Sequence, residues 1–267
     1  MVDCHNHSNF SFDAVDTVEA MCRRAEELNL KAFAITDHSD LDGKNLDECI
    51  KVVSNSVKAM EKFRNENKTT CEFLTGIELG EAIDYPEDAK KMLTLCNYDV
   101  VIGSYHNSPT GEDFYFMDCS TLTDEEIANY LNGYFDSVLK TVLYADIDVI
   151  AHITYPFRYV VGDYKRNASV SDYLDKITAI LKAVIDMGIS LEVNTSGLRQ
   201  KIKETLPNRE ILTLYRSLGG DKVSLGSDSH NTNDLSRGID ETIKVIKEIG
   251  FTHITYFRKR KPVQIEI

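Results

Sequence analysis

The stretch DVVIGSYH, residues 99–106, joins a short apolar run to a histidine. Continuous apolar runs of this length are typical of strands that are buried on both faces of a parallel sheet. Segments with helical period lie between such runs, so strands and helices alternate along the chain. The pattern predicts an α/β fold with a largely parallel, helix-covered sheet, either a barrel or a doubly wound sheet. The seven predicted strands are 2–6, 32–37, 72–79, 99–105, 148–153, 189–195 and 222–227.

The predicted helices have recognisable boundaries. Thr123 is followed three residues later by Glu126, which is the spacing of a capping box. Other helices are expected to start at Asp16 or Thr17 and at Ser169 or Ser171, and to end at Gly188, Gly219 and Gly250. The least regular stretches are 39–46, 107–121 and 155–168, and we expect them to form loops over a site.

Length and composition limit the function further. The 267 residues, 42% of them apolar, suffice for one large core, so we expect a single domain over residues 1–267. No leader-like or membrane-spanning segment is apparent, which predicts a soluble cytoplasmic protein. The six cysteines are isolated from one another and are expected to be reduced. The sequence indicates no oligomeric state.

The formal net charge of −13 opposes binding to long nucleic acids, because that binding needs lysines and arginines to displace counterions. One basic cluster, residues 258–261, lies near the C-terminal end, and we expect it to be a solvated tail.

Histidines fall at the ends of the predicted strands. Six of the seven histidines lie at or just beyond the C-terminal end of a strand, and only His253 does not. Carboxylates accompany them, including Asp37 beside His38. In a parallel barrel these ends meet on one face, so residues distant in sequence become neighbours. The gathered residues are His5, His7, Asp13, His38, Glu78, His106, His152, Asp228 and His230.

Any one of these histidines alone would more often be a hydrogen-bonded structural residue than a ligand. Together, converging imidazoles and carboxylates would leave many buried polar atoms unsatisfied unless a cation lay among them. Donors of this kind suit zinc, manganese or iron, and the sequence does not choose among these metals.

Alternation along the first strand places Cys4 in the core. Asp3 is expected either to hydrogen-bond a ligand imidazole or to lie at the surface.

Seven motifs of the chain resemble those of the polymerase-and-histidinol-phosphatase (PHP) family of metal-dependent phosphoesterases, and they occur in the family's order. They are DCHNHSNFSFDA at 3–14, ITDHSD at 35–40, GIELG at 76–80, GSYHN at 103–107, AHITYPFR at 151–158, EVNTSGLR at 192–199 and GSDSH at 226–230. The resemblance implies a distorted seven-stranded (β/α) barrel that holds three divalent metal ions at the C-terminal strand ends.

The resemblance also implies a ligand set for each ion. His5, His7, Glu78 and Asp228 would bind the first ion, and Asp13, His38 and His230 the second. Glu78 would bridge to the third ion with His106 and His152. Some family members have histidine at the position of Asp13, a difference that would alter the second ion's affinity or identity.

The segments YPFR and NTSGLR resemble those of the stand-alone histidinol-phosphate phosphatases, whose arginines bind the substrate phosphate. Arg158 and Arg199 are the matching residues here, with Asn194 and Ser196 as neighbours that could support the pocket. A guanidinium group can grip phosphate oxygens in a bidentate fork. The resemblance therefore implies hydrolysis of histidinol phosphate, a small-molecule phosphate ester, to histidinol and phosphate.

We expect a metal-bridging hydroxide to attack the phosphate, with a metal, His230 or Asp13 stabilising the leaving oxygen. The substrate's amine would suit an acidic loop residue, although each candidate is as readily a solvated surface charge: Asp40, Asp42, Glu81 and Asp84. The alternatives are an esterase acting on nucleotides or short oligonucleotides, a promiscuous phosphatase, and a metal-binding module without activity.

Overall fold

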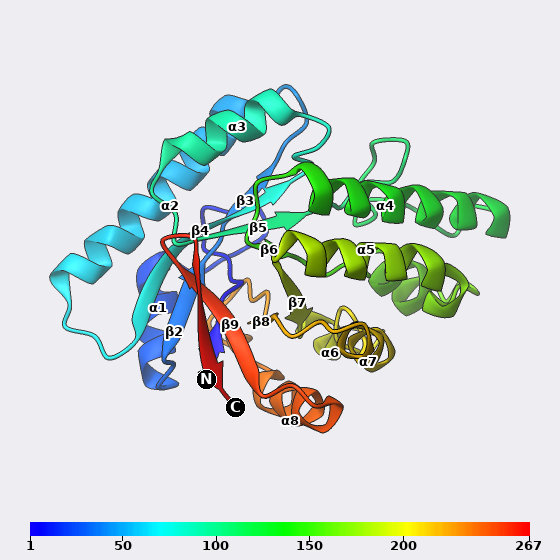
Figure 1. Cartoon of the computed structure of the whole chain (residues 1–267). Helices are drawn as coiled ribbons and strands as arrows, with labels where there is room; N and C mark the ends of the chain where they lie inside the picture. Colours follow the sequence, from blue (N-terminus) through cyan, green and yellow to red (C-terminus); the bar gives the residue numbers. More distant parts are fainter.

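A computed structural model describes all residues, 1–267. Its main sheet is parallel throughout, and its strands follow one another in space in the order of the sequence (Figure 1). The strands on this path are β1 (Val2–Asp3), β2 (Ala32–Ile35), β4 (Glu72–Gly80), β5 (Val100–Ser104), β6 (Val149–Ile150), β7 (Ser190–Asn194) and β8 (Val223–Gly226). All seven predicted strands are confirmed. The short β3 (His38–Asp40) continues β2 alongside β4 in the same register.

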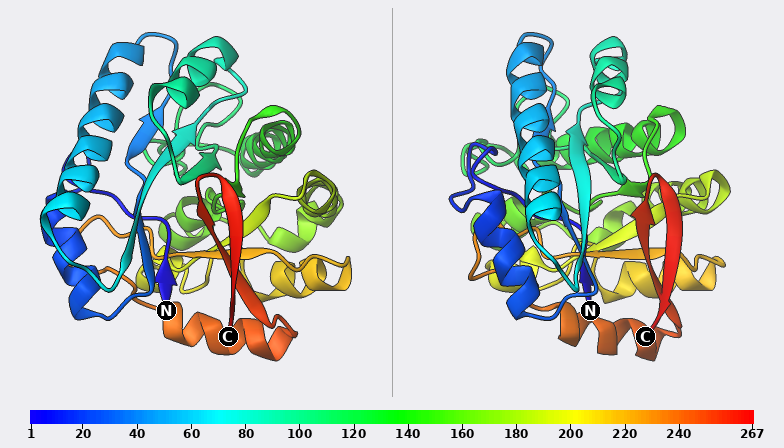
Figure 2. Two further views of the ribbon diagram at one scale, coloured as in Figure 1. Left: turned by 60° about the vertical axis from the view of Figure 1, so that its left-hand side comes forward. Right: turned by 90° about the vertical axis from the view of Figure 1, so that its left-hand side faces the viewer.

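The sheet curls until its first and last strands meet. Cys4 N donates to Leu225 O at 3.0 Å, and Asp228 N donates to His5 O at 2.8 Å. A further bond runs from His7 N to Ser229 O at 2.9 Å. These bonds join the end of β1 to the end of β8 and nearly close a barrel (Figure 2). The barrel is therefore confirmed over the doubly wound alternative.

Helices cover the outside of the barrel (Figure 1). They are α1 (Val18–Glu27), α2 (Leu46–Glu66), α3 (Pro86–Leu95), α4 (Asp124–Tyr144), α5 (Leu174–Met187), α6 (Ser196–Arg199), α7 (Arg209–Ser217) and α8 (Ile239–Ile249). Thr17 caps α1, and the capping box of Thr123 and Glu126 starts α4, as predicted. Gly188 and Gly250 end α5 and α8 in the left-handed conformation, also as predicted. None of these helices combines the length and the apolar character needed to cross a membrane.

The stretch 155–168 is more regular than expected. It contains the wide helical turn η1 (Arg158–Asp163), and Ser169 then caps the short 3₁₀ helix η2 (Val170–Tyr173) that leads into α5. Such π-helical turns occur often at functional sites. The stretch 107–121 has no helix or named strand, in agreement with the prediction.

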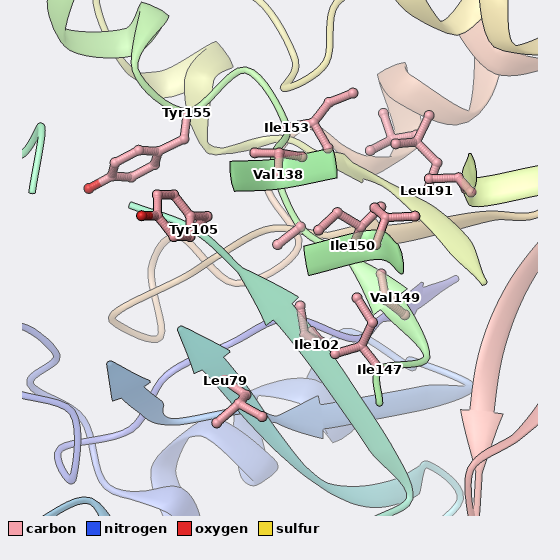
Figure 3. Packing of buried hydrophobic residues seen from close by; sticks show 14 of the residues in the cluster. Leu79, Ile102, Tyr105, Val138, Ile147, Val149, Ile150, Ile153, Tyr155 and Leu191 are labelled. Carbon is pink, nitrogen blue, oxygen red and sulfur yellow. The ribbon is translucent and has the colours of Figure 1, made fainter. Parts of the chain in front are cut away.

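Apolar side chains from neighbouring strands and the covering helices pack into a continuous core. Figure 3 shows part of it, where Ile102, Ile150 and Leu191 of successive strands lie close to Val138 of α4. Cys4 is buried in this cluster, as predicted. The rigid scaffold fixes where each strand ends, and it thereby fixes the site.

The basic cluster at 258–261 is not a solvated tail. It is the turn between β9 (His253–Arg258) and β10 (Lys261–Glu266), an antiparallel hairpin that packs beneath the barrel at the side where the strands begin. Arg258 pairs with Glu72, and Arg260 Nε lies 2.6 Å from Asp148 Oδ2. The prediction was wrong because carboxylates at the starts of distant strands supply partners for these arginines.

Candidate metal and phosphate site

The C-terminal ends of the strands bring the predicted residues to one place. His5 and His7 follow β1, His38 opens β3, and Glu78 lies in β4. The remaining residues follow the later strands: His106 after β5, His152 after β6, and Asp228 and His230 after β8. His253 lies away from this group in β9, as expected.

Glu78 is the centre of the cluster. Its Oε2 lies 3.2 Å from His5 Nε2, 3.5 Å from His7 Nε2 and 3.0 Å from His38 Nδ1. Its Oε1 lies 3.0 Å from His152 Nε2 and 3.3 Å from His106 Nε2. One fully buried carboxylate thus faces five imidazole rings. Such a carboxylate can serve two cations at once.

His7 lies between two other rings. Its centroid is 4.2 Å from that of His38 and 4.3 Å from that of His230, and both pairs are stacked. Asp13 completes this side, with its Oδ2 3.0 Å from His230 Nε2 and its Oδ1 3.8 Å from His38 Nε2. The loop after His7 therefore brings Asp13 to the cluster, although it is only partly buried.

The side chains form five groups whose donor atoms lie within 4.8 Å of one another: His5 with His7 and Asp228; His7 with His38 and His230; Glu78 with His106 and His152; His5 with His152 and Glu192; and Asp40 with Glu81 and His106. The third contains the residues expected for the third ion, and the first contains those expected for the first ion apart from Glu78. In the second, His7 accompanies His38 and His230, and Asp13 contacts both of these from outside.

Several buried atoms of the cluster have no hydrogen-bond partner: His5 Nε2, His7 Nε2, His38 Nδ1, His152 Nδ1 and Glu78 Oε2. Buried polar atoms are seldom left in this way in a native protein unless an ion or water serves them. Imidazole nitrogens and carboxylate oxygens are the donors that zinc, manganese and iron accept. The residues therefore fit a cluster of divalent cations.

The imidazoles of the metal-free cluster differ in charge. Burial, together with the neighbouring His38 and His230, lowers the pKa of His7 to about 3, so its ring is neutral and offers a lone pair. Burial alone would raise the pKa of Glu78, but His38 and His5 outweigh it and hold that pKa well below its ordinary value. Burial would lower the pKa of His5, His38 and His106, but nearby carboxylates outweigh it and hold these pKa values well above the ordinary value. Bound cations would take the place of the protons on these rings, because a metal ligand must be deprotonated.

Arg158 reaches the same cluster from η1. Its Nη2 donates to Ser196 Oγ at 2.7 Å and lies 3.4 Å from Asp228 Oδ2, and its guanidinium stacks on Tyr155 with the carbon 5.0 Å from the ring centroid. Asn194 donates to the same Asp228 oxygen at 3.2 Å. Arg158 is buried, yet its Nε has no partner. The arginine therefore keeps an unused hydrogen-bond donor.

Arg199 is held differently. Its Nη2 donates to the backbone oxygens of Ser227 at 2.9 Å and Asp228 at 3.3 Å, and its Nε lies 3.6 Å from Asp234 Oδ1. A cavity of about 250 Å³ over the cluster is lined by Arg158 but not by Arg199. Of the two predicted arginines, only Arg158 faces the cavity, although Arg199 Nη1 also lacks a partner.

A second cavity of about 620 Å³ adjoins the first and shares Phe12, His38, Asp40, His106 and Asp113 with it. Its other lining includes four carboxylates and two phenylalanines: Asp42, Glu48, Glu81, Glu112, Phe10 and Phe116. Asp84, which the sequence also suggested, accepts instead from Tyr105 Oη at 2.8 Å. The approach to the cluster is therefore acidic and partly aromatic.

Sequence reasoning missed Glu192 and misplaced Asp3. Asp3 is buried and accepts hydrogen bonds from Ser227 and Ser236, and none from an imidazole. The carboxylate behind His5 is Glu192, whose Oε1 lies 2.6 Å from His5 Nδ1. The segment LEVN offered a signal, because Glu192 and Asn194 are polar residues two apart in an otherwise apolar strand.

Comparison with known protein families now identifies the chain. The model of the PHP domain matches residues 3–196, which is most of the chain and includes nearly all of the cluster. The chain belongs to the PHP family. This agrees with the resemblance of its strand-end motifs.

Relatives of this PHP protein match it along nearly its whole length. A probable histidinol-phosphatase of Clostridium acetobutylicum is 30% identical over 263 residues, which is 97% of each chain. A probable histidinol-phosphatase of Thermotoga maritima is 26% identical over 260 residues, again 97% of each chain.

Among solved structures, the histidinol phosphate phosphatase of Lactococcus lactis is similar to this PHP protein with a TM-score of 0.81 and 22% identity, covering 98% of each chain. That protein was crystallised with zinc, L-histidinol and phosphate. At this identity the likeness establishes the barrel fold.

Proposed function

We propose that this protein is a metal-dependent phosphomonoesterase that hydrolyses L-histidinol phosphate to L-histidinol and phosphate. The observation that carries the proposal is that unpartnered imidazole nitrogens around Glu78 and the guanidinium group of Arg158 lie at one cavity. One half of this arrangement accepts cations and the other accepts an anion. The curated relatives named histidinol-phosphatase support the same reaction.

Three divalent ions would be held by the ligand sets that the family resemblance implies. His5, His7, Glu78 and Asp228 would hold the first, and Asp13, His38 and His230 the second. Glu78, His106 and His152 would hold the third. When bound, such ions would lower the pKa of a coordinated water to about 7 and offset negative charge on the phosphoryl oxygens. We also propose that residues 1–267 act as one domain, since the ligands come from both halves of the chain.

The chain's own residues would orient the phosphate. Arg158 is buried, is held by Ser196 and Asp228, and lines the cavity, so its guanidinium group would need no further ordering to meet an anion there. A preorganised guanidinium offsets the charge of the transferring group more strongly than a mobile one in water. Arg199 would act less directly, because it holds the backbone of Ser227 and Asp228.

The leaving oxygen needs a proton. His230 and Asp13 line the cavity, and the 3.0 Å between His230 Nε2 and Asp13 Oδ2 is a hydrogen-bond distance that holds one proton between them. This pair lies on the exposed side of the cluster, where the leaving group would depart. We assign general acid catalysis to this pair in the state in which these two atoms share the proton and do not hold the second ion.

The adjoining cavity favours a cationic organic group. Its carboxylates include Asp40, Asp42 and Glu112, and they would attract the amine of histidinol. The same carboxylates would repel the second phosphate of a dinucleotide. An oligonucleotide substrate is therefore disfavoured by the lining as well as by the net charge of −13.

The test is a comparison of kcat/KM for histidinol phosphate, a nucleoside monophosphate and a short oligonucleotide with the zinc-loaded protein. We expect histidinol phosphate to exceed the others by at least about 100-fold, a difference of roughly 3 kcal/mol in transition-state binding. Equal rates on all three would indicate a promiscuous phosphatase. Absence of hydrolysis in a protein that binds zinc would support the inactive metal-binding module.

A further inference from the structure

Glu192 is a buried carboxylate on β7 that contacts residues of two other strand ends. Its Oε1 lies 2.6 Å from His5 Nδ1, at the end of β1. Its Oε2 accepts the backbone N–H of His152 at 2.9 Å, at the end of β6, and the amide of Asn194 at 3.2 Å. Glu192 itself lies behind these residues and does not line the cavity. It therefore joins two predicted metal ligands from the outside.

Each group that faces Glu192 is a donor. A carboxylate can only accept, so the contact with Oε1 requires the proton of His5 to be on Nδ1. The other ring nitrogen, Nε2, then carries a lone pair, and this is the atom that lies unpartnered 3.2 Å from Glu78. The choice of tautomer thus determines which nitrogen of His5 can bind a cation.

Glu192 also supports the backbone of His152. That residue has φ of 20°, a conformation that side-chain-bearing residues adopt at a cost. The hydrogen bond from its N–H to Glu192 holds this conformation while Nε2 of the ring faces Glu78 at 3.0 Å. The neighbouring Gly226 leaves room for the carboxylate, since a Cβ there would lie 2.4 Å from Glu192 Oε1 and 2.5 Å from His5 Cβ.

We propose that Glu192 is a positioning residue that sets the metal-binding tautomer of His5 and the backbone of His152. The inference rests on the proposed function only in so far as that function places metal ions on these two rings. Residues with this relation to ligand histidines commonly change metal affinity about 10–100-fold when replaced.

The diagnostic variant is Glu192→Gln. Its amide has the same shape but only one acceptor, and two donors, His152 N–H and Asn194, face one end of the side chain. The amide oxygen should stay with these donors, which turns the NH₂ group toward His5 Nδ1. His5 must then carry its proton on Nε2, and its metal-binding lone pair is lost.

The experiment compares zinc binding to metal-stripped wild-type and Glu192→Gln proteins by calorimetric titration. We expect a loss of about 10–100-fold in zinc affinity. Asp3→Asn is the matched control, because Asp3 is an equally buried carboxylate whose donors are serines and backbone N–H groups. Its zinc affinity should stay within about twofold of wild type, even where both variants unfold at lower denaturant concentration.

A second measurement needs no variant. The ¹⁵N shifts of the imidazoles in the zinc-loaded wild-type protein report which nitrogen of each ring carries a proton and which binds the metal, and we expect His5 to carry its proton on Nδ1 and zinc on Nε2. Zinc on His5 Nδ1, or equal zinc affinity of wild type and Glu192→Gln, would overturn the role of Glu192 while leaving the proposed function intact. Failure of the wild-type protein to bind zinc at all would overturn both.

Discussion

The two ends of the barrel both bury carboxylates but treat them differently. Where the strands begin, Asp148 accepts from Val101 N at 2.8 Å and pairs with Arg260 at 2.6 Å. Asp99 there accepts from Thr75 N at 3.0 Å and from Lys259 N at 3.0 Å. Where the strands end, Glu78 faces five imidazoles, and of these contacts only the one between His152 Nε2 and Glu78 Oε1, at 3.0 Å, is a hydrogen bond.

The difference distinguishes a structural end from a chemical one. The carboxylates at the strand starts are satisfied by the protein alone, so that end needs nothing further to be stable. At the other end, His5 Nε2, His7 Nε2, His38 Nδ1 and Glu78 Oε2 are buried without hydrogen-bond partners, which is costly unless a cation intervenes. In this protein, a buried carboxylate therefore indicates function only where the groups around it leave hydrogen-bonding atoms without partners.

Replacing Glu78 by glutamine should have the largest effect on activity. The variant loses the carboxylate that faces all five rings, so we expect kcat/KM to fall by more than about 10³-fold together with metal content. Asp148→Asn, at the opposite end, should keep kcat/KM within about twofold while lowering the free energy of unfolding by about 1–3 kcal/mol. Metal analysis and denaturant unfolding measure both variants. A Glu78→Gln protein that keeps its metal and its activity would contradict the proposed difference between the two ends of the barrel.

Removing the metal should destabilise only the side of the barrel where the strands end. At a zinc concentration about 100-fold above the dissociation constant, bound metal would contribute about 2.7 kcal/mol to stability. Chelation should therefore lower the unfolding free energy by about that amount, and zinc should restore it. Hydrogen exchange would locate the loss at 5–13, 38, 106, 152 and 228–230. Faster hydrogen exchange in the 253–266 hairpin instead would contradict the placing of the metal site at the strand ends.

Arg158→Gln should weaken phosphate binding without removing metal. We expect the inhibition constant of inorganic phosphate to rise about 10–100-fold, since a buried guanidinium makes charge-assisted bonds worth about 1.5–3 kcal/mol. Arg199→Gln should have a smaller effect, because Arg199 does not line the cavity. Arg209→Gln, which removes only an exposed pair with Glu248, is the control and should leave inhibition unchanged. Equal inhibition constants for Arg158→Gln and wild type would exclude the phosphate role.

The smallest effect is expected at the hairpin. A hydrogen bond from Arg258 lowers the pKa of Glu72 below its ordinary value of 4.5. A depressed carboxyl pKa stabilises the fold above the unfolded-state value, and this contribution disappears as pH falls through the folded-state pKa. Arg258→Gln should therefore be slightly less stable than wild type at pH 7, since solvent screens this exposed pair, and should match wild type well below the folded-state pKa. Denaturant unfolding at both pH values measures this, and a difference that persists in acid would exclude the mechanism.

Much of the fold and of the site could be predicted because the signals are local. Apolar runs located the seven strands, and Thr123 with Glu126 located the start of α4. The six histidines of the cluster were found because parallel strands must end on one face. The hairpin at 253–266 was missed because its apolar residues were not distinguished from a charged tail.

The sequence by itself determined where strands and helices lie and which side chains follow each strand, since short-range periodicity encodes both. Only the tertiary structure decided that β1 meets β8, that Asp3 binds Ser227, 224 residues away, and that Glu192 lies behind His5. It also decided that Arg158 rather than Arg199 faces the cavity. These pairings depend on the curvature of the closed barrel and on side-chain geometry across it, and no local pattern in the chain carries that information.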